Sequence, residues 1–366
     1  MIDEQTRELE DEEYEELRPE LSRGRKIAVI ALGVMIVVVL FGSLVSFWAY
    51  RQLFPSGHVG SELVIDIPSG SSTNSIADLL EKKGVIDNAF LFKLYLKAKS
   101  GGPFQAGTYR IPTHDGADDV LRRLRAGPLP PPTRRFTVPP GLNLRQIPGA
   151  IVAGIPTFSV DKLNAALTAG AVHSQFQPAT KPIEGFLFPD TYEVGEGADE
   201  TAAIQLMVSQ FDRVANELGL ADAQSLVGYD PYQVLIVASL VEEEAKVDAD
   251  RPKIARVIYN RLSRGTPLGV DATLCYLKDE RPCVLHQSDL TSDSPYNTRA
   301  RSGLPPTPIA NISRKALEAA LRPDDSDALY YVLDPNLPPG QHLFTSSASE
   351  FEAAKARCRA AGLGCD

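Results

Sequence analysis

The longest apolar stretch of the chain lies close to its start. Residues 27–50 form a run of 24 positions without a charged side chain, which is long enough to cross a bilayer as one helix. Three basic residues lie directly before the run, and three aromatic residues close its far end. This order predicts a single membrane span with a cytoplasmic N-terminus. A cleaved signal peptide is the alternative, which the length of the run and the lack of a small-residue cleavage site disfavour.

The first 26 residues have the opposite character. They contain ten acidic and five basic residues, so this short tail carries a net −5 of the formal −10 of the whole chain. A segment with so much charge and so little apolar surface cannot bury a core, and we expect residues 1–26 to be a disordered cytoplasmic tail. The chain has no clustered Lys and Arg of the kind that binds nucleic acid, so no nucleic-acid partner is expected.

After the span, the pattern changes between short strands and short helices. It predicts a small α+β unit over residues 61–126 that begins β-α-α-β, and the proline run that follows marks a domain boundary. The expected elements are strands at 62–67 and 106–111 and helices near 76–83, 88–99 and 117–125. The order is similar to that of the LysM-like module of cell-wall proteins, which would add a sugar-binding role. The alternative is a spacer that holds the next domain away from the membrane.

Residues 131–366 predict a second α+β domain, which is organised around one dense apolar run. Pro231–Ala245 (PYQVLIVASLVEEEA) has apolar residues in nearly every direction of a helical wheel, so this central helix should be buried. Asp230 at the cap and Pro231 in the first turn start the helix in the usual way. Asp250 is expected to cap the next helix, which Gly265 ends.

Three consecutive glutamates end the central helix, and a helical wheel separates them. At about 100° per residue, Glu243 shares its side with Ser239 and has the easiest route to water. Glu242 and Glu244 flank the apolar stripe on opposite sides. A carboxyl held against apolar surface has a raised pKa, which makes a general acid that works near neutral pH. Glutamates that simply reach solvent are the alternative, and helix geometry alone does not choose between the two.

A second stretch also carries residue types that suit a sugar-binding cleft. The segment KPIEGFLFPDTYEV at 181–194 places the rings of Phe188 and Tyr192 beside the carboxyls of Glu184 and Asp190. We expect a rigid aromatic loop here, because apolar rings with a few placed polar groups are typical of ligand sites. An ordinary packed turn is the alternative for such a segment taken alone.

All four cysteines follow the predicted span, in a part of the chain where disulfides persist outside the cytoplasm. Three connectivities are possible. The pairs Cys275–Cys283 and Cys358–Cys365 are preferred because each closes a short loop. Their spacings do not resemble those of zinc ligands, so no metal site is expected.

Several short motifs in one order carry a resemblance. They are EGFLFPDTY at 184–192, ASLVEEEA at 238–245, NRL at 260–262, GVDATLCY at 269–276, YNT at 296–298, GLPPTPI at 303–309 and HLFT at 342–345. From about residue 27 onward, the chain resembles the endolytic murein transglycosylases of the MltG/YceG-like family. It departs from the family pattern at Arg299, where an aromatic residue often follows Tyr-Asn-Thr, and at Thr345, where Asn often follows Phe.

The resemblance implies cleavage of the MurNAc–GlcNAc bond inside glycan strands, without water, to leave a 1,6-anhydro-MurNAc end. The family's catalytic glutamate is the last of a Glu-x-Glu pair, which corresponds to Glu244, with Glu242 as the first member. Protonated Glu244 would donate to the glycosidic oxygen. Its carboxylate would then accept the proton of the sugar's own 6-hydroxyl as that oxygen attacks the anomeric carbon. The nucleophile belongs to the substrate, so no cofactor is expected.

The other polar and aromatic residues of these motifs are expected to bind the glycan. They are Glu184, Phe188, Asp190, Tyr192, Asp271, Thr273, Tyr296, Asn297 and Thr298. The resemblance also implies a bacterial cell membrane location, with peptidoglycan strands, the cytoplasmic membrane and the wall-synthesis machinery as partners. Two alternatives stay open: a hydrolase in which Asp271 or Asp190 activates water, and a wall-binding scaffold without turnover.

Overall fold

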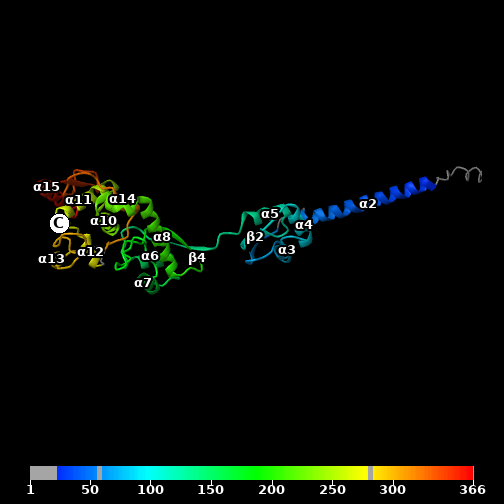
Figure 1. Cartoon of the computed structure of the whole chain (residues 1–366), viewed down its shortest axis with the longest axis horizontal. Helices are drawn as coiled ribbons and strands as arrows, with labels where there is room; N and C mark the ends of the chain where they lie inside the picture. Colours follow the sequence, from blue (N-terminus) through cyan, green and yellow to red (C-terminus); the bar gives the residue numbers. More distant parts are fainter. Residues whose placement is uncertain (1–22, 56–59, 279–282, 366) are drawn as a thin grey trace, which may run out of the picture. The chain divides into compact units, whose positions relative to one another are not determined.

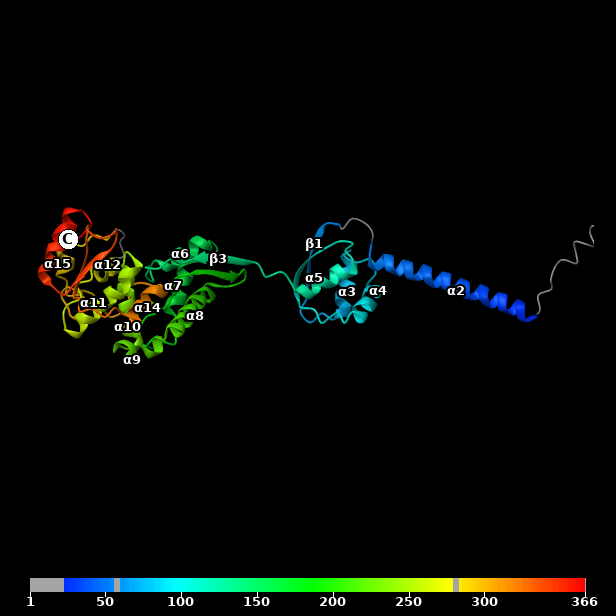
Figure 2. The same cartoon turned by 90° about the horizontal axis from the view of Figure 1, so that it is seen from above.

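A computed structural model describes residues 23–55, 60–278 and 283–365 of the chain (Figure 1). The chain divides into two compact units between Pro131 and Pro132. The first unit contains the long apolar helix and a small α+β unit, and the second contains the remaining helices and strands (Figure 2). Both sheet and helix are present in each α+β region, as the sequence predicts.

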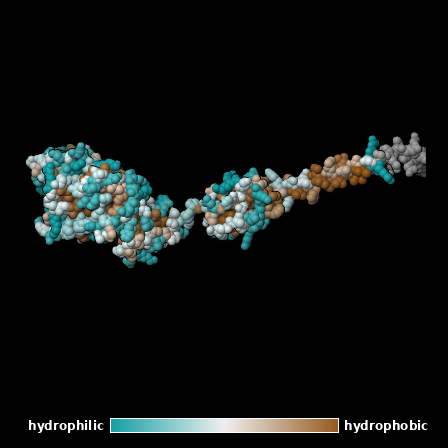
Figure 3. Space-filling view, viewed as in Figure 1, coloured by the Kyte–Doolittle hydropathy of each residue, from teal (hydrophilic) through white to brown (hydrophobic). Residues whose placement is uncertain are grey.

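Helix α2 (Arg23–Leu53) contains the whole apolar run and has no buried residue. It is the brown helix of Figure 3. By length and composition it is sufficient to cross a membrane. It is longer than the expected span of 27–50 because the basic residues before the run and one turn after it are helical as well. At its end, Leu53 and Phe54 pack against the core of the small α+β unit.

The small α+β unit has the β-α-α-β order that the sequence predicts. Its elements are β1 (Glu62–Ile67), α3 (Thr73–Lys82), α4 (Ala89–Ala98), β2 (Gly107–Pro112) and α5 (Ala117–Ala126), and β1 pairs antiparallel with β2. The side chains of Ser72 and Asn88 accept backbone hydrogen bonds at the starts of α3 and α4, which explains where these helices begin. Ile65 and Ile67, two residues apart on β1, both point into the core.

The second unit is mostly helical, and its described strands form two antiparallel pairs, β3 with β4 and β5 with β6. The strands are β3 (Thr133–Thr137), β4 (Thr191–Gly195), β5 (Tyr330–Leu333) and β6 (His342–Thr345). The helices are α6 (Ile147–Gly154), α7 (Val160–Thr168), α8 (Glu200–Leu218), α9 (Ala223–Val227), α10 (Pro231–Glu244), α11 (Arg251–Ser263), α12 (Ala272–Lys278), α13 (Gln287–Leu290), α14 (Arg314–Leu321) and α15 (Ala348–Ala360), with short 3₁₀ turns at Leu220–Asp222 and Asp248–Asp250.

Helix α10 lies in the core of the second unit. Every residue from Val234 to Val241 is buried, and α11, α12 and α14 pack on it. Burying one such aliphatic side chain contributes roughly 1.5–3 kcal/mol to folding, so this helix is a large part of the core. Asp230 and Gln233 form a reciprocal capping box at its start, with Pro231 in the first turn. The helix ends at Glu244.

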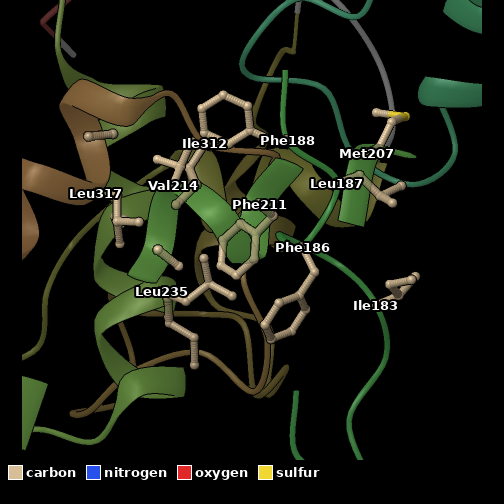
Figure 4. Close-up of a cluster of buried hydrophobic side chains, with 14 of the residues drawn as sticks. Ile183, Phe186, Leu187, Phe188, Met207, Phe211, Val214, Leu235, Ile312 and Leu317 are labelled. Atoms are coloured by element: carbon tan, nitrogen blue, oxygen red, sulfur yellow. The ribbon is translucent and has the colours of Figure 1, made fainter. Parts of the chain in front are cut away.

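The segment 181–194 is the packed turn that the sequence offered as the alternative, since residues 181–190 form neither helix nor strand. Phe186 and Phe188 lie among buried apolar side chains, as Figure 4 shows, and residues from Thr191 onward form β4. Gly185 has a φ of 86°, and a Cβ added there would lie 2.7 Å from the Cβ of Pro308. The segment therefore packs tightly against the proline-rich stretch at 303–309, and its rings contribute to the core.

Candidate active site

The carboxyl of Glu244 lies at the C-terminal end of α10, with Tyr331 of β5 beside it. The Tyr331 hydroxyl donates a hydrogen bond of 2.9 Å to Glu244 Oε2. Burial raises the pKa of Glu244, and the negative charges of Asp271 and Glu243 raise it further, while the Tyr331 bond and Lys246 oppose the rise. The negative end of the helix dipole also disfavours an ionised carboxyl at this position. Glu244 is thus suited to hold a proton and donate it.

The Tyr331 hydroxyl acts as the hydrogen-bond donor to the Glu244 carboxyl. Burial and the neighbouring Glu244 raise the pKa of Tyr331 well above its ordinary value, so the hydroxyl keeps its proton. Its ring contacts the rings of His342 and Phe344 in β6, with centroids 5.5 Å and 6.1 Å away. Among the residues that the structure describes, Tyr331 makes the one hydrogen bond to the Glu244 carboxyl. Oε1 is therefore the oxygen left for a substrate.

Behind Tyr331, a buried His–Asp pair ties β6 to the start of α11. Asp250 Oδ2 accepts hydrogen bonds from the backbone nitrogen of His342 at 2.8 Å and from its Nδ1 at 2.9 Å. Burial lowers the pKa of His342, which favours the neutral ring with Nδ1 protonated toward Asp250. Asp250 stands at the N-cap position of α11, as the sequence predicts, but its side chain makes no cap bond there and binds His342 instead.

Asp271 and Arg299, which both interact electrostatically with Glu244, form an ion pair. Both carboxylate oxygens of Asp271 accept from the guanidinium, and the Nη2–Oδ2 distance is 2.8 Å. Asp271 is the main cause of a raised pKa of Arg299, and the charge of Glu244 contributes to the same shift. The pair is partly exposed, with 36% of the Arg299 side chain and 47% of the Asp271 side chain accessible. A cation and its counter-charge thus lie within electrostatic range of the Glu244 carboxyl.

Three of the residues that were predicted to bind glycan instead stabilise the backbone around the Asp271–Arg299 ion pair. Asn297 is fully buried, and its amide donates to the carbonyls of Leu290 and Ser292. Thr273 and Thr298 are also buried, bond to each other at 3.2 Å, and hold the backbone of Val270. Their polar groups are used inside the protein. They position the segments that carry Asp271 and Arg299.

Glu242 lies on the opposite face of the same helix end, and both of its carboxylate oxygens are bonded to other residues of the protein. Its Oε2 accepts from the backbone nitrogen and the hydroxyl of Ser313 at 2.8 Å and 2.5 Å. Its Oε1 pairs with Arg251 at 3.2 Å, and only 5% of the Glu242 side chain is exposed. Glu243, expected from the wheel to face water, is half-buried, and a Cβ added at Gly141 would lie 3.1 Å from its Oε1.

A second cluster surrounds the buried Glu184, one of the residues predicted to bind glycan. Its carboxyl accepts from the Tyr276 hydroxyl at 2.9 Å and from the Leu144 backbone nitrogen. Burial raises the pKa of Glu184 to about 7, although these hydrogen bonds and the charge of Arg145 lower it. The Tyr276 ring lies 5.3 Å from that of Tyr296, centroid to centroid. Asp271 directly precedes α12, and Tyr276 lies on α12 five residues after Asp271, so α12 connects the two clusters.

The remaining predicted residues lie at the start of β4. Phe188 belongs to the core, and the Tyr192 hydroxyl donates to the Phe188 carbonyl at 2.6 Å. Asp190 is exposed and accepts from Gln210 at 3.1 Å. No contact described in the structure joins these three residues to Glu244, so they form a structural group of their own.

Two disulfides join Cys275 to Cys283 and Cys358 to Cys365, the pairs preferred from the sequence. The first fastens α12 beside Tyr276, and the second lies at the end of α15. Within the described ranges, no three His, Cys, Asp or Glu side chains are grouped so as to hold a metal ion.

Comparison with known proteins places the chain in a family. A model of the YceG-like family matches residues 65–357. The chain belongs to the YceG-like family. An endolytic murein transglycosylase of Bacillus subtilis (strain 168) is 35% identical over 306 residues, which cover 80% of this chain and 83% of that protein. One of Streptococcus pneumoniae serotype 2 is 28% identical, and the match covers 74% of this chain and 54% of that protein. A solved yceG-like protein of Listeria monocytogenes has a TM-score of 0.53 and 29% identity, covering 80% of this chain and 99% of that one.

Within this YceG-like chain, sequence reasoning missed the residue closest to the Glu244 carboxyl. Tyr331 lies 87 residues after Glu244 and outside every motif that we identified. The one local signal is a Tyr-Tyr pair in a short β-like stretch, which many core strands share. Tyr276 and Arg145, which surround Glu184, were also missed as site residues. The bond of Tyr276 to Glu184 and the contact of Arg145 with the Tyr276 ring join segments that lie far apart along the chain.

Proposed function

We propose that this YceG-like protein is a membrane-anchored endolytic lytic transglycosylase with Glu244 as its general acid and base. The proposal is carried by one observation, the half-buried Glu244 at the end of α10, whose carboxyl has a raised pKa and accepts a hydrogen bond from Tyr331 on one oxygen. The substrate comes from the relatives named endolytic murein transglycosylases, and is the glycan strand of peptidoglycan.

In the reaction, protonated Glu244 donates its proton to the oxygen of the MurNAc–GlcNAc bond, which then breaks. Positive charge builds at the MurNAc anomeric carbon as the GlcNAc oxygen leaves. The Tyr331 hydroxyl and the Arg299 cation stabilise the Glu244 carboxylate formed in this step. That carboxylate then takes the proton of the 6-hydroxyl of the same MurNAc as its oxygen bonds to the anomeric carbon. The product is a 1,6-anhydro-MurNAc end, and Glu244 regains its proton.

The arrangement favours this route over hydrolysis. An inverting or retaining hydrolase needs a second carboxylate as base or nucleophile. Asp271 lies near Glu244, but both of its oxygens accept from Arg299, and Glu242 is occupied by Arg251 and Ser313. Asp190 makes no described contact with the Glu244 group. An internal nucleophile from the sugar removes the need for a second free carboxylate.

We also propose that the two clusters joined by α12 bind the glycan. The half-buried rings of Tyr276 and Tyr296 can stack on sugar faces, and Glu184 sets the orientation of the Tyr276 hydroxyl. Asn297, Thr273 and Thr298 act on the glycan indirectly, because they position Asp271 and Arg299.

The membrane part of the proposal rests on α2. With its basic residues on the cytoplasmic side, α2 would anchor the chain in the bacterial cell membrane with the second unit outside. Two disulfides in that unit agree with an oxidising compartment. The β-α-α-β unit would be a LysM-like module, and the wall-synthesis machinery the neighbouring partner. Residues 1–22 of the acidic tail lie outside the described residues.

The experiment is mass spectrometry of the products that the purified full chain releases from un-cross-linked glycan strands. We expect internal cleavage and ends that are lighter by one water than reducing MurNAc ends. Reducing ends would show a hydrolase. Release of products only from strand ends would contradict endolytic cleavage, and binding without any products would indicate a scaffold.

A further inference from the structure

Helix α4 of the small α+β unit exposes an apolar face. Phe90 and Leu94 lie one turn apart and are 74% and 59% exposed. Lys93 and Lys97 share this side of the helix, since the four residues follow the i, i+3, i+4, i+7 pattern. We call these four residues the Phe90 face. Exposed aromatic and aliphatic side chains on this scale usually mark a contact surface.

The Phe90 face borders a shallow groove with a volume of about 410 Å³. The groove is lined by Thr73, Asn74, Phe90, Lys93, Leu94, Leu96, Lys97 and Gly101. No acidic side chain is in this lining. The groove and the face together offer apolar surface beside two cations and a few hydroxyl and amide groups, which is the chemistry of a phospholipid surface: acyl chains, phosphate and glycerol oxygens.

The position of α4 along the chain places this face near the end of the predicted span. Phe54 follows α2 directly, and its ring packs edge-on against Tyr95 of α4 at a centroid distance of 6.1 Å. Leu94 is the residue next to Tyr95. At about 100° per residue, Tyr95 lies on a different side of α4 from the Phe90 face. Helix α4 thus contacts the end of α2 with one side and carries the Phe90 face on another, and both lie on one helix of ten residues, about 15 Å long.

The charges of α4 fit an anionic surface. Its sequence AFLFKLYLKA contains two lysines and no acidic residue. Lys93 pairs with Asp78 at 2.5 Å, while no ion pair with Lys97 is found among the described residues. Lysine stems can lie along apolar surface while their ammonium groups reach phosphates. Helices with this combination bind in the plane of a membrane interface.

We propose that the Phe90 face rests on the outer surface of the same bilayer that α2 crosses. Phe90 and Leu94 enter the boundary between headgroups and acyl chains, and Lys93 and Lys97 contact lipid phosphates. The inference rests on the anchoring role of α2 in the proposed function. It makes the small α+β unit a membrane-bound base instead of a freely moving spacer.

The test uses the full chain reconstituted into vesicles of phosphatidylglycerol and phosphatidylethanolamine. Phe90→Cys is labelled with an environment-sensitive fluorophore, which is selective because the four native cysteines are paired. The matched control is Val64→Cys, at an exposed apolar position of β1 (66% exposed) outside the groove. We expect the label at 90 to shift to shorter wavelength and to be quenched by spin-labelled lipids, and the label at 64 to show neither change.

Adding Lys97→Glu to the Phe90→Cys chain should weaken the quenching, because it replaces a cation of the face with an anion. Equal quenching at 64 and 90, or none at 90, would overturn the proposal. A label at 90 that does not respond to lipids but responds to soluble glycan oligomers would instead make the groove a sugar site.

Flotation of the chain with vesicles and glycan cleavage are measured in parallel. A chain that floats and cleaves but is not quenched disproves this inference alone, whereas a chain that does not float disproves the anchoring.

Discussion

The two faces at the C-terminal end of α10 each carry a glutamate carboxyl, but the two carboxyls have different bonding partners. Glu242 is surrounded by partners, with Arg251 on one oxygen and two Ser313 donors on the other. Glu244 has one neutral partner, Tyr331, and two acidic neighbours that oppose its ionisation. The Glu242 side chain is 5% exposed and Glu244 is half-buried, so both are partly withdrawn from water and burial alone does not explain their different roles.

The difference lies in what compensates the buried charge. A carboxyl that is bonded to a cation and to two hydrogen-bond donors is held in place by them, and it joins α10 to α11 and α14. A carboxyl without a cation bonded to it gains by keeping its proton. The first arrangement is structural and the second is suited to proton transfer. The predictions below test that division, ordered by their expected effect on turnover.

Replacing the proton donor should have the largest effect. We expect Glu244→Gln to lower glycan cleavage by about 10³-fold or more, because general acid and base steps each contribute roughly 10²–10⁴-fold. Folding should persist, since Gln can still accept the Tyr331 bond. Muropeptide release and the melting temperature measure the two effects. Glu243→Gln, the same change one residue earlier, is the control and should stay close to full activity. Normal cleavage by Glu244→Gln would disprove the assignment.

Tyr331→Phe should lower turnover by about tenfold, the equivalent of one hydrogen bond in the transition state. The Tyr331 bond lowers the pKa of Glu244, so its loss raises that pKa. Activity is lost as pH rises and Glu244 gives up its proton. The alkaline limb of the pH–activity profile should therefore move to higher pH in the variant.

The matched control is Tyr330→Phe, in the same strand, whose ring stacks on Phe351 and leaves Glu244 untouched. Its profile should overlay that of the unmodified chain. Lower turnover in Tyr331→Phe with an unmoved alkaline limb would assign Tyr331 a purely structural role.

Glu242→Gln should act mainly on stability. It leaves Arg251, which is 14% exposed, with the exposed Asp248 as its remaining carboxylate, and removing one member of a buried pair costs up to about 3 kcal/mol. We expect a clear loss in melting temperature and, well below it, turnover within a few-fold of normal. Glu217→Gln, which removes an exposed carboxylate paired with Arg213 and Arg314, is the control and should hardly change melting. A loss of turnover in Glu242→Gln equal to that in Glu244→Gln would mean that the pair acts as one catalytic unit.

A third carboxyl, that of the buried Glu184, extends the comparison. Replacing Glu184 should change the pH dependence of stability more than it changes turnover. Its pKa is raised from 4.5 to about 7 in the folded chain. Between these values the unfolded chain has released the proton and the folded chain keeps it, so stability falls as pH rises through this window. Glu184→Gln cannot titrate, and its melting temperature should fall less between pH 5 and pH 8. The exposed Glu193→Gln serves as control, and an unchanged pH slope in Glu184→Gln would contradict the shifted pKa.

The local pattern of apolar, polar and capping residues was sufficient to predict most of the helices and strands. Alternation predicted β1 at its observed bounds, and the Asp-Pro start and apolar wheel predicted the start and burial of α10. These features depend on residues within a few positions of each other, where spacing and capping act directly. The prediction missed a strand where a distant partner decides, because the end of segment 181–194 pairs with β3 as β4.

What the sequence alone determined is therefore the apolar span, the order of strands and helices, and a buried helix that ends in three glutamates. It did not decide which glutamate keeps its proton. Only the tertiary structure shows Arg251 and Ser313 at Glu242 and Tyr331 at Glu244, with Tyr331 brought from 87 residues away. The physical reason is that a carboxyl's pKa depends on the charges and donors within a few ångströms, and no periodicity along the chain encodes those neighbours.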